Sequence, residues 1–216
     1  MGRRLTEEQM EMTTDIEGWT WPFKDAKCWP WLQKEHDLPD IITAHCENTR
    51  VVVEAGGNAG FYVKKYADLF DTVYTFEPDN LNFYCLSQNV REKNVIKMQA
   101  CLGYNRDQVS LVNSRGNIGM YHVKTGESGI IPTLQIDDLN LDVCDLIHLD
   151  IEGFEFEALQ GSLETIKRCK PVIALEWLNH STKFGSSNEI IEKFLNELNY
   201  QAVQNVYHEI IFKHIL

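Results

Sequence analysis

The 216-residue sequence contains no long run of apolar residues, because its uninterrupted apolar stretches are only a few residues long. A helix that crosses a membrane needs about 20 mostly apolar residues. The first eight residues also lack the apolar core of a secretion signal. We therefore expect a cytoplasmic protein that has no membrane partner.

Cysteine pairs with metal-binding spacing are missing as well. None of the six cysteines belongs to a Cys-x-x-Cys motif, which argues against a zinc site. Scattered cysteines are typical of reduced, mostly buried thiols in a cytoplasmic protein. They are Cys28, Cys46, Cys85, Cys101, Cys144 and Cys169. We expect no bound metal.

Positive charge is scarce. The 20 Lys and Arg residues are outnumbered by 32 Asp and Glu residues, and the formal net charge is −12. A protein whose main partner is a nucleic acid usually presents a basic face, so we expect no nucleic-acid partner. Hydrophobic residues make up 44% of the chain, and its length suits one domain with a substantial core.

The most informative stretch is residues 51–60, which read Val-Val-Val-Glu-Ala-Gly-Gly-Asn-Ala-Gly. Three β-branched residues predict a strand that ends on the carboxylate of Glu54. The glycines then allow a tight turn into a helix that begins near Phe61. Glycines at such a turn tolerate positive φ and let the backbone approach a ligand closely.

A second carboxylate follows at the spacing of a nucleoside site. Residues 72–76 predict another strand, and Glu77 follows it, 17 residues after Gly60. An acid about 20 residues beyond a glycine-rich turn is placed to accept hydrogen bonds from ribose hydroxyls. The sequence therefore predicts a nucleoside-containing cofactor.

The order of residues in the turn indicates which cofactor. A dinucleotide-binding loop reads Gly-x-Gly-x-x-Gly, whereas this turn reads Glu54-x-Gly56-x-Asn58-x-Gly60. A leading carboxylate would repel a pyrophosphate but would suit the amino group of S-adenosylmethionine (SAM). We expect Gly56 and Gly60 to lie along the methionine part of SAM. Asn58 either donates a hydrogen bond to the carboxylate of the methionine part or fixes the turn.

Predicted strands and helices alternate from Gly60 onward, which indicates a doubly wound α/β fold with a mostly parallel sheet. Residues 105–132 predict two short strands, with turns at 114–116 and 125–126. The other predicted strands are 51–54, 72–76, 95–100, 145–150, 171–176 and a closing antiparallel pair at 200–203 and 209–213. Two helices are predicted to begin near residues 61 and 80, and two more to cover 155–168 and 190–198.

Four of these strands end on an acid. Right-handed crossovers place the carboxyl ends of parallel strands at one edge, where open α/β sheets bind ligands. We therefore expect Glu54, Glu77, Asp150 and Glu176 to lie together at that edge. The adenine is expected just beyond the third strand, near Cys101.

Several motifs together resemble the FkbM family of SAM-dependent methyltransferases. The glycine turn is followed, in the order of that family, by further motifs within about residues 51–176. These are Phe76-Glu77-Pro78, Asn89-Val90, Thr133-Leu134-Gln135-Ile136-Asp137-Asp138-Leu139 and Asp150-Ile151-Glu152-Gly153-Phe154-Glu155. No single motif is specific, but the combination is.

The resemblance implies a Rossmann-like class I methyltransferase domain over residues 46–216. Its sheet would be seven-stranded and mostly parallel, with a C-terminal antiparallel hairpin. The implied reaction is transfer of a methyl group from SAM to a hydroxyl of a small molecule or sugar. Glu77 and Pro78, in a matching motif, are expected to contact the cofactor.

One position departs from the pattern of the family. The residue before Leu149 is often lysine there, and here it is His148. Histidine can be neutral or charged near pH 7, so any role that rests on a permanent positive charge is in doubt. A hydrogen-bonded core histidine is the favoured interpretation.

Asp150 and Glu152 are the candidate catalytic residues. An acceptor hydroxyl needs a base as its proton leaves, and the end of the fourth strand faces the methyl group. Asp150 is the first candidate for base or for orienting the acceptor, and Glu152 is the second. Asp150 could alternatively hold the amino group of SAM, and His180 is a weaker candidate base. The two acids could also bind a divalent ion, although we expect none.

Residues 1–45 lie outside the similarity and hold four of the five tryptophans. These are Trp19, Trp21, Trp29 and Trp31. Aromatic faces stack well on flat groups such as sugar rings. Two interpretations stay open: a lid over the acceptor site, or an arm that packs on the sheet or forms a dimer contact.

Other functions also stay open at this stage. An NAD-type oxidoreductase would use a similar sheet, but Asn58 and the spacing of the turn disfavour it. A catalytically silent SAM-binding protein would retain the same pocket. RNA methylation is opposed by the acidic charge of the chain.

Overall fold

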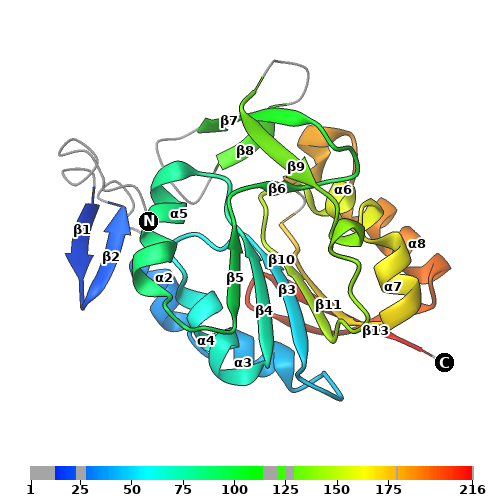
Figure 1. Cartoon of the computed structure of the whole chain (residues 1–216). Coiled ribbons are helices and arrows are strands. Elements are labelled where there is room, and N and C mark those ends of the chain that lie inside the picture. The colour runs from blue at the N-terminus through cyan, green and yellow to red at the C-terminus, as the bar shows by residue number, and fades with distance from the viewer. Residues whose placement is uncertain (1–12, 23–27, 114–120, 125–128, 179, 216) are drawn as a thin grey trace.

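A seven-stranded sheet forms the centre of the protein in the computed structural model, which describes residues 13–22, 28–113, 121–124, 129–178 and 180–215 (Figure 1). In spatial order its strands are β12 (Tyr200–Val206), β13 (Glu209–His214), β11 (Val172–Glu176), β10 (Leu146–Leu149), β3 (Val51–Ala55), β4 (Thr72–Phe76) and β5 (Val95–Met98). From β11 to β5 the strands are parallel, and β13 is antiparallel to both of its neighbours. The predicted mostly parallel sheet and its closing hairpin are confirmed.

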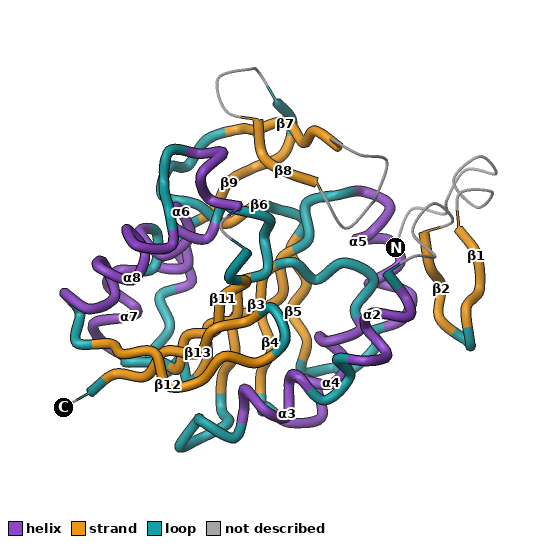
Figure 2. Tube along the Cα trace, turned by 180° about the vertical axis from the view of Figure 1, so that it is seen from behind, coloured by secondary structure: helices purple, strands orange, loops and turns teal. Residues whose placement is uncertain are grey.

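Helices cover both faces of this sheet (Figures 1 and 2). One face packs on α3 (Leu38–Thr43), α4 (Phe61–Leu69) and α5 (Asn80–Asn89). The other packs on α6 (Glu155–Gln160), α7 (Leu163–Cys169) and α8 (Asn188–Glu197). In the part of the chain that the structure describes, none of the helices combines the length and the apolar character needed to span a membrane.

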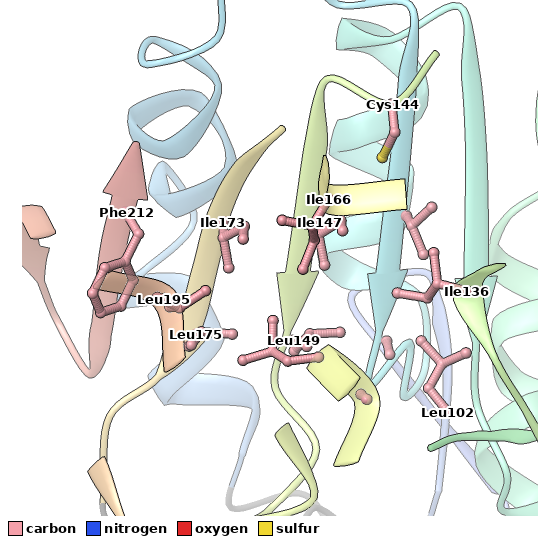
Figure 3. Packing of buried hydrophobic residues seen from close by; sticks show 14 of the residues in the cluster. Leu102, Ile136, Cys144, Ile147, Leu149, Ile166, Ile173, Leu175, Leu195 and Phe212 are labelled. Carbon is pink, nitrogen blue, oxygen red and sulfur yellow. The ribbon is translucent and has the colours of Figure 1, made fainter. Parts of the chain in front are cut away.

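The core between the sheet and α6–α8 follows from the alternation of side chains along the strands. Ile147 and Leu149 of β10 lie beside Ile173 and Leu175 of β11, and all four are fully buried (Figure 3). Burying a side chain of this size stabilises the fold by about 1.5–3 kcal/mol. The residues between them, including His148, therefore face α4 on the other side of the sheet.

A smaller sheet lies beyond the carboxyl end of β5 (Figure 1). Its strands, in spatial order, are β6 (Cys101–Leu102), β9 (Ile131–Leu134), β7 (Gln108–Asn113) and β8 (Tyr121–Lys124). Residues 105–132 therefore contribute to three strands and not to two, because β9 begins inside this segment and pairs with both β6 and β7. The turns predicted at 114–116 and 125–126 lie outside the described residues.

The predicted helix over residues 155–168 is two helices, α6 and α7. Gly161 interrupts it, since a Cβ there would lie 2.1 Å from the carbonyl oxygen of Gly103. The Gly161 carbonyl oxygen accepts a hydrogen bond from the backbone N–H of Asp137, in the short 3₁₀ helix η3 (Ile136–Leu139). A tertiary contact that local periodicity does not reveal thus sets the break.

In the described residues, the N-terminal arm contains a hairpin of β1 (Thr13–Ile16) and β2 (Trp19–Pro22), then α2 (Trp29–Lys34), which precedes α3. Trp21 and Trp29 are buried, with ring centroids 5.3 Å apart, and Trp29 lies 5.7 Å from Phe61 of α4. These two tryptophans pack the arm onto the domain. Trp31 is different, because 58% of its surface is exposed.

Asn89 fastens this arm to the glycine turn. Its Oδ1 accepts a hydrogen bond from the backbone N–H of Thr20 at 2.8 Å. Its Nδ2 donates to the carbonyl oxygens of Thr20 at 2.8 Å and Ala59 at 2.7 Å. One side chain therefore joins β2, α5 and the start of α4.

We expect Asn89→Ala to lower the free energy of unfolding by about 2–4 kcal/mol, because three hydrogen bonds are lost and their backbone partners are left unpaired. Urea denaturation followed by circular dichroism measures this. Asn196→Ala, at an exposed position of α8, is the matched control and should change the stability by no more than about 0.5 kcal/mol. Equal effects of the two substitutions would contradict the assignment.

Candidate functional site

A cavity of about 380 Å³ opens at the carboxyl edge of the large sheet, in the volume range of small-molecule sites. It lies where β3 and β10 are neighbours and their connections leave in opposite directions, the position at which open α/β sheets bind ligands. Seven of the nine predicted site residues line it. They are Gly56, Asn58, Glu77, Pro78, Cys101, Asp150 and Glu152.

The glycine turn forms the floor of the cavity. The backbone N–H groups of Gly56 and Gly57 donate to the carbonyl oxygen of Phe76 at 3.0 and 3.1 Å. Gly56 has φ +98°, and a Cβ there would lie 2.0 Å from the carbonyl oxygen of Asp150. Only glycine fits at this position, because both the conformation and the close contact exclude a side chain.

Glu54 and Gly60 do not line the cavity, in contrast to the expectation that both would contact the methionine part of SAM. Strand alternation points the side chain of Glu54 toward α4. There it accepts a hydrogen bond from the Thr75 hydroxyl at 2.5 Å. A Cβ on Gly60 would meet Val90 at 2.6 Å and Leu86 at 3.0 Å. Both residues support the turn from below.

Glu77 is held in place by the backbone. Its Oε2 accepts from the N–H of Asn58 and its Oε1 from the N–H of Asp79, both at 2.8 Å. Burial nevertheless raises the pKa of Glu77 to about 8. The side chain of Asn82 also hydrogen-bonds this carboxylate, which still has lone-pair capacity for one further donor, such as a ribose hydroxyl.

The apolar end of the cavity lies where the adenine was expected. Ala100, Cys101 and Leu102 line it beside Pro78 and Phe76. Burial raises the pKa of the Cys101 thiol to about 12, so this thiol is neutral near pH 7. A flat apolar base fits such a wall better than a charged group does.

Asp150 and Glu152 lie on the turn that follows β10. Oε1 of Glu155 accepts from the N–H groups of Ile151 at 3.2 Å and Gly153 at 3.0 Å, which fixes this turn. Burial and the nearby carboxylates raise the pKa values of Asp150 and Glu152 to about 7 each. Both groups can therefore exchange a proton near neutral pH.

Glu176 and His180 border the same side of the cavity. Nδ1 of His180 lies 3.1 Å from Oε2 of Glu152 and 3.3 Å from Oε2 of Glu176. His180 begins the 3₁₀ helix η4 (His180–Phe184), whereas Glu176 ends β11. Burial, followed by the charges of Asp150 and Glu152, raises the pKa of Glu176 well above its ordinary value.

His148 is a core histidine, as predicted. It is 1% exposed, and its Nδ1 lies 3.0 Å from the Tyr66 hydroxyl. Its Nε2 lies 3.7 Å from Oε2 of Glu209. Burial lowers the pKa of His148, so the permanent cation of a lysine has no equivalent here.

Several lining residues were not predicted as site residues, and three of them carry polar groups that lie near one another. Glu35 comes from the arm, Tyr62 from α4 and His208 from the turn between β12 and β13. The Tyr62 hydroxyl donates to Oε2 of Glu35 at 3.5 Å, and Nε2 of His208 lies 4.0 Å from its Oε1. Tyr62 falls within the predicted helix that begins near Phe61, and no local pattern marks Glu35 or His208.

The cavity is strongly acidic. Among the described residues that line it, five carry carboxyl groups and none is lysine or arginine. The five are Glu35, Glu77, Asp150, Glu152 and Glu176. Such a cavity favours a positively charged ligand.

Comparison with solved structures shows the same fold in other proteins. The methyltransferase FkbM from Methylobacillus flagellatus superposes with a TM-score of 0.53 at 18% identity, over 77% of this chain and 44% of that one. Precorrin 8W decarboxylase from Methanobacterium thermoautotrophicum gives 0.51 at 14% identity, over 83% and 90%. N-methyltransferase NodS from Bradyrhizobium japonicum gives 0.51 at 10% identity, over 86% and 97%.

The chain thus spans less than half of the FkbM relative. Comparison with curated proteins gives no significant match. The family model described as the methyltransferase FkbM domain matches residues 54–202, which is more than half of the chain and includes the glycine turn, Glu77 and Asp150. The chain therefore belongs to the FkbM methyltransferase family.

Proposed function

We propose that this methyltransferase uses SAM and transfers the methyl group to a hydroxyl of a small molecule or sugar. One observation carries the proposal: the glycine turn, Glu77 and Asp150 surround one cavity at the switch point of the sheet. Membership of the FkbM family supports methyl transfer. The hydroxyl acceptor is inferred from the resemblance and from the acid–base groups at the site.

The residues present fit SAM. The missing side chain at Gly56 leaves room for the methionine part, and Glu77 has lone pairs left for the ribose hydroxyls. The wall at Cys101 suits the adenine. SAM carries a sulfonium and an ammonium group, which match the acidic lining.

Bound SAM would supply an electrophilic methyl group to the acceptor oxygen, and its sulfur would keep the electron pair of the broken carbon–sulfur bond. Asp150 would accept the proton that leaves the acceptor hydroxyl. Its pKa of about 7 suits a general base near neutral pH. Glu152 and His180 would orient the acceptor, since displacement requires the reacting atoms to be aligned.

The arm forms one wall of the proposed acceptor site. Trp31, Leu32 and Glu35 line the cavity, although Trp21 and Trp29 pack inside the domain. The exposed ring of Trp31 is available to stack on a flat or sugar-like acceptor. Closure of this wall as a lid stays a prediction.

All six cysteines are free thiols, and we propose the cytoplasm as their compartment. We propose neither a nucleic acid nor a membrane as partner, because the net charge is −12 and would repel phosphate-rich surfaces.

Donor identity can be tested by calorimetric titration of the protein with SAM and with NAD. We expect SAM to bind and NAD not to bind. Glu77→Gln should weaken SAM binding about 10- to 100-fold, because it removes a charged hydrogen-bond acceptor. Glu47→Gln, at an exposed position, should leave the affinity unchanged. Binding of NAD alone would favour the oxidoreductase.

The affinity for SAM should rise about tenfold between pH 5.5 and pH 7. In the free protein the pKa of Glu77 is raised to about 8, so Glu77 is largely protonated at pH 5.5. A cationic ligand prefers the ionised carboxylate, so binding strengthens as the proton leaves. Titration in two buffers of different ionisation enthalpy should show net proton release at pH 7. Proton uptake or a flat profile would contradict this.

Catalysis can be tested by following S-adenosylhomocysteine release with a panel of hydroxyl compounds. With an accepted substrate, Asp150→Asn should lower kcat about 100-fold or more, because the base is lost. The Kd of SAM should change by no more than about threefold if Asp150 serves the acceptor and not the donor. Asp142→Asn, at an exposed position, is the control. SAM binding without turnover of any acceptor would favour a catalytically silent protein.

A further inference from the structure

Three side chains from separate segments converge on the acceptor side of the cavity: Glu152, Glu176 and His180. One ligand atom from each lies within 4.8 Å of the other two. We propose that these three residues bind a divalent metal ion next to the methyl-transfer site. The sequence led us to expect no metal and suggested Asp150 with Glu152 as the alternative pair, whereas the three-residue site leaves Asp150 available as base.

The fold fixes the spacing of these ligands. Glu152 has φ +57° and Gly153 has φ +109°, so the turn after β10 bends back onto η4. A Cβ on Gly153 would lie 2.6 Å from the backbone of His180, so a side chain here would push the two segments apart. The carboxylate of Glu155 holds the same turn through two backbone N–H groups.

The charges around the site call for a cation. Ligand oxygens of Glu152 and Glu176 lie within 4.8 Å of each other, so the two carboxylates repel when both are ionised. Oε2 of Glu152 is buried and receives no hydrogen bond from the described residues. Lysine and arginine are absent from the described lining of the cavity. A dication between the carboxylates would remove this repulsion. SAM would not do so, because its proposed position is at the glycine turn.

The donor set indicates the class of ion. Two carboxylates and one imidazole suit Mn²⁺, Mg²⁺ or Zn²⁺ better than a thiolate-selecting ion. Three protein ligands would leave coordination positions open toward the cavity. Catalytic metal sites keep such an open position, whereas structural sites are closed by protein ligands. Mn²⁺ is the best probe, because it accepts both oxygen and nitrogen ligands and is paramagnetic.

The metal would sharpen the proposed function, on which this part of the inference rests. An acceptor hydroxyl bound to the ion would have a lowered pKa and a fixed position. Its proton would pass to Asp150 as the oxygen bonds to the methyl carbon. Hydroxyl compounds that can also coordinate a metal are therefore the preferred acceptor class.

The test is titration of the ligand-free protein with Mn²⁺, with the free ion measured by electron paramagnetic resonance. We expect one saturable site in the wild type. Glu176→Gln should weaken it at least about tenfold, since even residues that only support metal ligands cost about that much. Glu35→Gln removes the same charge from the same cavity outside the three-residue site, and should change the affinity by no more than about threefold.

A second substitution guards against misfolding of the first. His180→Ala should also weaken Mn²⁺ binding at least about tenfold, and circular dichroism should show both variants folded. If the wild-type protein does not bind Mn²⁺, Mg²⁺ or Zn²⁺ saturably, the proposed metal site is wrong. It is also wrong if Glu176→Gln and Glu35→Gln reduce binding equally, because the ion would then respond only to the overall charge of the cavity.

The metal site and the proposed function fail separately. SAM binding without metal binding overturns the metal site alone. Metal binding without SAM binding overturns the proposed function and leaves the three-residue site intact. Enhanced water proton relaxation by bound Mn²⁺ would show that open coordination positions face the cavity, and relaxation no greater than that of free Mn²⁺ would contradict such open positions.

Discussion

The whole site depends on the direct contact between the glycine turn and the end of β10. The N–H of Asp150 donates to the carbonyl oxygen of Ala55 at 3.0 Å, and Gly56 lies so close to Asp150 that a Cβ would overlap its carbonyl oxygen. Backbone therefore touches backbone at the switch point of the sheet. Because no side chain separates the two strands, a cavity forms above them and Glu77 and Asp150 line it together.

The consequence is an unusual concentration of buried acid. Burial raises the pKa values of Glu77, Asp150 and Glu152 to near or above neutral. These carboxyl groups are therefore partly protonated near pH 7 when no ligand is bound. Glu54 and His148 form a second buried polar cluster, which lies below the glycine turn on the side of the sheet that faces α4. The cavity side of the molecule therefore favours positively charged ligands, and SAM and a divalent metal ion are the two that we propose.

The acceptor side is built from parts that are far apart in the chain. Glu35 of the arm lies beside His208 of the C-terminal hairpin, and the Tyr207 hydroxyl donates to Asp37 at 2.7 Å. Asn89 secures the start of the same arm to the glycine turn. Such contacts join segments more than 150 residues apart or use a side chain with no local signature, so sequence periodicity could not reveal them.

The sequence by itself determined the order of strands and helices, the glycine turn and the acids after β4 and β10, because these follow from local side-chain alternation and backbone preference. It also indicated the family and seven of the residues that line the cavity. Only the tertiary structure decided that Glu54 faces away, that Gly161 breaks a helix, and that Glu176 and His180 meet Glu152. These outcomes depend on distances between segments, and such distances arise only when the whole chain packs.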